Sequence, residues 1–122
     1  MTETSAPARD EWAQSLDQLT KDREGDLVTI DVVDPAIGDQ EEVERLPFTY
    51  ANYDWKDNVV VVAVGGNTAR YPVVLRHIVS EPVEVTISEL PGDGAAVRIV
   101  DDEGTVTLVS LYRPTETTTE PT

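Results

Sequence analysis

The sequence predicts a mainly β (α+β) fold, in which an N-terminal helix packs on a seven-stranded, mostly antiparallel curled sheet or small barrel. Two observations predict it. Apolar residues recur at helical spacing only near the N-terminus, in residues 9–22. From residue 27 to residue 112, short β-rich runs alternate with turn residues at intervals of about ten residues. A chain of 122 residues is long enough to bury a core of its own.

The helix is predicted over residues 9–22. Trp12, Leu16 and Leu19 stand at positions i, i+4 and i+7, which places them along one apolar stripe. Acidic residues open this segment and basic residues close it, in agreement with the helix dipole. Gly25 follows as a C-terminal stop signal.

Seven strands are predicted after the helix, and short connections between them favour antiparallel neighbours. Turn-favouring residues separate the strands, and the longest such stretch runs from Pro47 to Asp57. The run Val59–Val64 is apolar on both faces, so we expect a central strand covered by the helix or by a second sheet. The predicted strands are Leu27–Val33, Gln40–Leu46, Asn58–Val64, Arg70–Val79, Val83–Leu90, Ala95–Val100 and Thr105–Tyr112.

Residues 8–113 are expected to form a single globular domain. Residues 1–7 and the Thr/Glu/Pro tail, residues 114–122, are expected to be disordered, because they have too little apolar surface to offset their ordering entropy. The chain has no cysteine, and no apolar run approaches the roughly 18 residues of a membrane span. A cytoplasmic location is therefore expected, with no membrane partner.

The charge is strongly acidic, with 24 Asp plus Glu against 9 Lys plus Arg and a net charge of −15. Such a surface disfavours binding to nucleic acid or to anionic membranes, since phosphate affinity comes largely from Lys and Arg. Three interpretations of the charge stay open: an ordinary solvated surface, adaptation to salt, and mimicry of DNA.

Several short strings give the sequence a family resemblance. RDEW opens the helix, EGDLVTIDV and DPAIGDQEEVERLPF follow it, and RHIVSEPVEVTI and DDEGTVTLVSLY come later. Over about residues 9–112 the chain resembles an uncharacterised bacterial and archaeal domain family, one of the domains of unknown function common in actinobacteria. The resemblance implies no known activity, substrate or cofactor.

An aromatic group between Pro47 and Lys56 is the first candidate for a binding surface. Large amphipathic rings provide contact area at a low entropy cost. The alternative is that the rings cap one end of the β-core. The group consists of Phe48, Tyr50, Tyr53 and Trp55.

Arg70, Arg76 and His77 are the other candidate residues. Both arginines lie in the segment from Asn58 to Ser80, which contains no Asp or Glu, so they either grip a carboxylate or phosphate or pair with neighbouring strands. His77 is the only histidine of the chain and lies in the opposite strand phase. It is expected to be a buried or boundary residue unless a nucleophile and an orienting group lie beside it.

No motif for metal, phosphate or cofactor binding stands out. The acidic turns at residues 22–26 and 101–104 lack the ligand spacing of a calcium loop, and no helix follows Gly65-Gly66-Asn67. No cofactor and no metal ligand are predicted.

The sequence therefore favours a non-catalytic binding module with a protein partner. The alternatives are a small ligand-binding barrel or enzyme that uses His77, and an acidic DNA mimic.

Overall fold

The computed structural model describes residues 4–5, 7–66 and 74–113. A short 3-10 turn, η1 (Arg9–Glu11), leads directly into the helix α1 (Trp12–Asp22). Trp12, Leu16 and Leu19 are buried along one side of α1, which confirms the predicted apolar stripe. The helix ends one residue before Arg23, whose N–H bonds to the Leu19 carbonyl.

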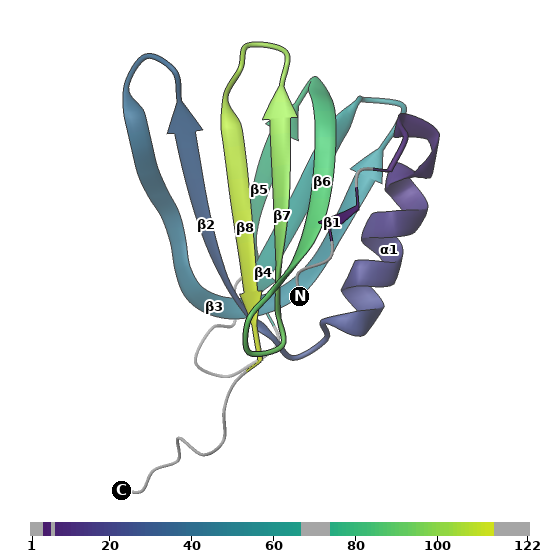
Figure 1. The fold of residues 1–122 in the computed structure, drawn as a ribbon, viewed down its shortest axis with the longest axis vertical. Helices are drawn as coiled ribbons and strands as arrows, with labels where there is room; N and C mark the ends of the chain where they lie inside the picture. The colour runs from purple at the N-terminus through teal and green to yellow at the C-terminus, as the bar shows by residue number, and fades with distance from the viewer. Residues whose placement is uncertain (1–3, 6, 67–73, 114–122) are drawn as a thin grey trace, which may run out of the picture.

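Antiparallel strands and the turns between them make up the rest of the described chain (Figure 1). Their order in the sheet is β1-β6-β7-β8-β2-β3-β4-β5. The outermost strands, β1 and β5, are not paired with each other, so the sheet is curled but open and the barrel alternative is wrong. The two-residue strand β1 was not predicted, since two residues carry no periodicity. The strands are β1 (Thr4–Ser5), β2 (Leu27–Asp34), β3 (Gly38–Asp54), β4 (Val59–Gly65), β5 (Val74–Ser80), β6 (Pro82–Leu90), β7 (Gly94–Asp101) and β8 (Val106–Tyr112).

The prediction that residues 47–57 form a turn is wrong for most of that stretch, because strand β3 runs for 17 residues and ends only at Asp54. Its first part pairs with β2 as far as Pro47, and its second part pairs with β4 from Phe48 onward. The strand thus changes partner at a proline, which has no N–H to give to a ladder. Register shifts on both sides and a positive φ of 56° at Arg45 accompany the change.

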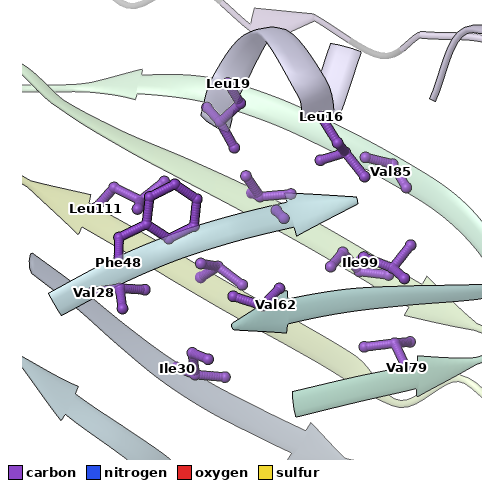
Figure 2. Packing of buried hydrophobic residues seen from close by; sticks show 14 of the residues in the cluster. Leu16, Leu19, Val28, Ile30, Phe48, Val62, Val79, Val85, Ile99 and Leu111 are labelled. Carbon is purple, nitrogen blue, oxygen red and sulfur yellow. The ribbon is translucent and has the colours of Figure 1, made fainter. Parts of the chain in front are cut away.

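The bend in β3 folds the sheet into two layers. Strands β6, β7, β8 and β2 form one layer, and the second part of β3 with β4 and β5 forms the other (Figure 1). Helix α1 packs against β3 at the side of the two layers. Figure 2 shows Leu16 and Leu19 of α1 pointing into a buried cluster that includes Phe48, Val62 and Ile99.

Thr20 of α1 covers the backbone edge of β3 that β2 no longer reaches. Its Oγ1 lies 3.0 Å from both the N–H and the carbonyl oxygen of Ala51, and 2.9 Å from the Leu16 carbonyl. An uncovered strand edge can pair with a strand of another molecule. Helix α1 therefore both packs on the core and shields this edge of β3.

Strand β4 lies between β3 and β5, one strand from the edge of the sheet and not at its centre as predicted. Val60, Val62 and Val64 point into the core and are at most 1% exposed. Val59 and Val61 are only half-buried, so the apolar run keeps part of its other face near the surface. That outer face carries the candidate site.

Candidate functional site

The outer face of the second layer brings together residues that are far apart in the sequence. Side chains that are partners in register lie side by side on the same face of an antiparallel sheet. Two such rows cross this face, from β3 through β4 to β5. The rows are Tyr50, Ala63 and Arg76, and Asn52, Val61 and Ile78.

Trp55 stands at one end of this face, in the turn after β3, and its side chain is 71% exposed. The Lys56 ammonium lies 5.8 Å from the centre of the Trp55 ring, within the range of a cation–π contact. Ile78 on β5 is 55% exposed. We call the surface formed by Tyr50, Trp55, Lys56, Val61, Arg76 and Ile78 the Trp55 face.

Two open hollows share Trp55 as part of their lining. One, of about 660 Å³, lies beside the start of the helix, and the other, of about 560 Å³, lies over β3 and β4. The first is lined by Arg9, Asp10, Ala13, Tyr53 and Trp55. The second is lined by Tyr50, Asn52, Tyr53, Asp54, Trp55, Lys56, Val61 and Arg76.

Tyr50 orients Arg76 within the second hollow. The Arg76 Nε donates a hydrogen bond of 3.1 Å to the Tyr50 hydroxyl oxygen. A guanidinium has five N–H donors in a rigid fork, so this bond leaves the two Nη groups of Arg76 for other acceptors. The side chain is exposed, and Tyr50 restricts the directions in which its remaining donors point.

Tyr53 belongs to the core side of β3 and has a structural role. Its ring meets Trp12 edge to face at 5.1 Å, and its hydroxyl donates to the Asn58 Oδ1 at 2.7 Å. Arg9 stacks on Trp12 with 4.6 Å to the ring centre and donates to the same Asn58 oxygen at 3.1 Å. These contacts fix the turn that carries Trp55 to the start of the helix.

Lys56 and Arg76 differ from four of the six other cations that the structure describes. Lys21, Arg23, Arg98 and Arg113 each form an ion pair with a carboxylate, whereas neither Lys56 nor Arg76 does so among the described residues. The one acid among the lining residues of their hollow is Asp54. Its Oδ1 accepts the backbone N–H groups of Lys56 at 3.0 Å and Asp57 at 3.4 Å, which stabilises the turn.

His77 lies on the opposite side of β5 from Arg76. It is half-buried, is in register with the core residue Val62, and lines a separate hollow of about 400 Å³ beside the turn between β7 and β8. Ser80 and Asp101 line the same hollow. The Asp101 Oδ1 accepts the N–H groups of Glu103 and Thr105 at 2.9 Å, so this carboxylate closes its own turn.

The candidate residues are therefore not one site. Tyr50, Trp55 and Arg76 share the Trp55 face, Tyr53 anchors it from beneath, and His77 belongs to the other hollow. Arg70 lies outside the described residues. In the part of the chain that the structure covers, no three His, Asp or Glu side chains are placed to hold a metal ion, and no helix has the length and apolar character needed to cross a membrane.

Lys56, Val61 and Ile78 were not predicted as parts of this surface. The contribution of Val61 and Ile78 depends on the register between β3, β4 and β5, which joins residues up to 26 positions apart, as Tyr50 and Arg76 show. Lys56 lies in the turn, next to Trp55 in the chain. The acid-free segment from Asn58 to Ser80 was the available indication, because it contains Val61, Arg76 and Ile78.

Comparison with known proteins confirms the expected resemblance. The model of DUF5335, a family of unknown function, matches residues 4–120. A protein of Aquifex aeolicus (strain VF5), named only "Uncharacterized protein", is 32% identical over 102 residues, which span 84% of this chain and 86% of that relative. No solved structure matches the chain significantly. Function must therefore be argued from the geometry of the molecule.

Proposed function

Since the chain belongs to the DUF5335 family of unknown function, we propose its function from the geometry alone: a non-catalytic, cytoplasmic interaction module that binds a protein partner through the Trp55 face. The absence of cysteine from the chain agrees with a reducing compartment.

The exposure of Trp55 is the observation that carries this proposal. A tryptophan ring that is 71% exposed leaves a large apolar area in water, and its burial by a partner is favourable. Tryptophan, tyrosine and arginine are also the residues most enriched among the energetic centres of protein interfaces. The Trp55 face presents one of each, in Trp55, Tyr50 and Arg76.

A protein partner fits this surface better than a small ligand. Small-molecule sites are usually concave and enclose most of the ligand. Here the exposed ring stands between two open hollows, and the half-buried Val61 and exposed Ile78 extend the apolar surface across β4 and β5. A broad surface with one projecting aromatic ring suits a partner that covers it from outside.

The enzyme hypothesis based on His77 has less support. Small-molecule and catalytic sites are usually enclosed and mostly apolar, with a few placed polar groups. The hollow beside His77 is open, and four carboxylates line it, those of Glu81, Asp101, Asp102 and Glu103.

The proposal is tested by selecting binders from a random peptide library displayed on phage. Enriched peptides should lose affinity by about tenfold or more for Trp55→Ala, the effect expected of a central interface residue. Ile37→Ala is the matched control, because Ile37 is 67% exposed and lies in the turn between β2 and β3. Enrichment of no peptide, or of peptides that bind Trp55→Ala as tightly as the wild type, would contradict the proposal.

A further inference from the structure

We propose that the Trp55 face recognises a segment of the partner that carries a carboxylate next to an apolar side chain. The carboxylate binds to Arg76, Tyr50 and Lys56, while the apolar side chain packs on Trp55 and Val61. This inference rests on the proposed function and names the chemistry of the partner.

The hydrogen-bonding groups of the hollow over β3 and β4 are the first argument. The Tyr50 hydroxyl accepts a bond from the Arg76 Nε, which leaves its own proton to be donated. The Nη groups of Arg76 and the ammonium of Lys56 are donors only. The hollow therefore presents several donors, two of them on cations, and an anionic acceptor such as a carboxylate satisfies them best.

The distribution of charge is the second argument. Carboxylates outnumber cations by 24 to 9 in this chain, so a cation easily finds an internal partner, as Arg98 does with Glu84 at 3.6 Å. Lys56 and Arg76 have no such ion pair within the described residues. The one carboxylate that lines their hollow, Asp54, accepts the backbone N–H groups of Lys56 and Asp57 through its Oδ1, and the segment from Asn58 to Ser80 adds no acid. Their charges are left available to a carboxylate from outside.

The net charge of −15 does not prevent this recognition. At physiological ionic strength the Debye length is about 8 Å, so distant carboxylates are largely screened while groups in direct contact are not. A basic segment would be attracted to the molecule as a whole, but on this face its cations would meet Arg76 and Lys56. Juxtaposed like charges disfavour that partner.

The test measures the binding of three labelled peptides, in which Leu alternates with Glu, Gln or Lys, by fluorescence anisotropy. The Glu peptide should bind about tenfold more tightly than the Gln peptide, as a charge-assisted pair allows, and the Lys peptide should bind least. Arg76→Gln should remove the preference for Glu, and Tyr50→Phe should reduce it. Arg98→Gln, which removes a half-exposed cation outside the Trp55 face, should leave the preference intact.

Equal binding of the Glu and Gln peptides, or tighter binding of the Lys peptide, would overturn the carboxylate inference. If peptide binding still fell with Trp55→Ala, the proposed function would stand without the carboxylate inference. If no peptide distinguished Trp55→Ala from the wild type, both the inference and the proposed function would fail.

Discussion

At the scale of single residues, Asp26 shows how a charge is held inside this small protein. Its side chain is fully buried and lies 3.1 Å from Arg23 and 3.4 Å from Arg113. Arg23 also donates to the carbonyl of Asp93, in the turn between β6 and β7, and to that of Gly94, the first residue of β7. One carboxylate thus connects the end of α1, the start of β2, that turn and the end of β8.

Asp26→Ala is expected to lower the free energy of unfolding by about 3–5 kcal/mol, because the mostly buried Arg23 would lose its counter-charge. Urea denaturation followed by circular dichroism measures the change. Asp17→Ala is the control: Asp17 is 68% exposed and pairs with Lys21 at 3.5 Å, so its loss should cost no more than about 0.5 kcal/mol. Equal effects of the two substitutions would show that the buried pair is not a special source of stability.

Asp26 and Asp17 look alike in the sequence, and only the fold separates them. Residues 22–26 were predicted as an acidic turn, which the positive φ of 91° at Gly25 agrees with. The burial of Asp26 could not be predicted, since its partner Arg113 is 87 positions away. In the same way, Trp55 and Arg76 were predicted as binding residues, but their grouping with Lys56 and Val61 depends on strand register.

At the scale of elements, the pairing of α1 with β3 depends on Thr20. The Ala51 N–H, which points away from β4 towards the helix, has the Thr20 hydroxyl oxygen as its acceptor at 3.0 Å. Ala51 is 4% exposed, so water does not readily replace this acceptor.

Thr20→Val keeps the shape of the side chain and removes the hydroxyl, which leaves the Ala51 N–H buried without an acceptor. We expect a loss of about 1–3 kcal/mol in the free energy of unfolding, the cost of an unsatisfied buried donor. Thr20→Ser retains the hydroxyl and is expected to lose less. Chemical denaturation compares the three proteins, and hydrogen exchange at Ala51 reports the local effect. A loss in Thr20→Ser with none in Thr20→Val would assign the role of Thr20 to its methyl group instead.

Helix α1 and strand β3 show why one element was predicted well and the other was not. The stripe of Trp12, Leu16 and Leu19 has a single period, and all three residues meet the same core. Strand β3 has two partners and register shifts on either side of Pro47, so its alternation is broken where the sheet bends. Proline and the asparagine and aspartate residues that follow it also favour turns, and they hid the second part of the strand.

At the scale of the whole molecule, charge is unevenly distributed. The segment from Asn58 to Ser80 contains no carboxylate and contributes β4 and β5, which form most of the second layer. The remaining chain therefore carries all of the 24 Asp and Glu residues. The acid-free segment was visible in the sequence. That it forms most of one layer follows from the bend in β3.

The net charge of −15 predicts that sodium chloride stabilises the protein. Raising the ionic strength from about 0.01 M to about 0.15 M shortens the Debye length from about 30 to about 8 Å, which weakens repulsion among the carboxylates. The melting temperature should rise over this range. Calcium chloride at matched ionic strength should give the same value. A melting temperature that falls with salt would mean that attractive pairs outweigh the repulsion, and a rise specific to calcium would indicate a cation site.

The most direct test of the Trp55 face as the binding surface uses the indole N–H groups of the two tryptophans as internal probes. Trp55 is 71% exposed, whereas Trp12 is 2% exposed and its Nε1 donates to the Pro7 carbonyl at 3.1 Å. In ¹⁵N–¹H correlation spectra, the Leu/Glu peptide should shift the Trp55 indole signal saturably and leave that of Trp12 in place. A saturable shift of signals from β6 and β7, with the Trp55 signal unmoved, would place the binding surface elsewhere and contradict the account.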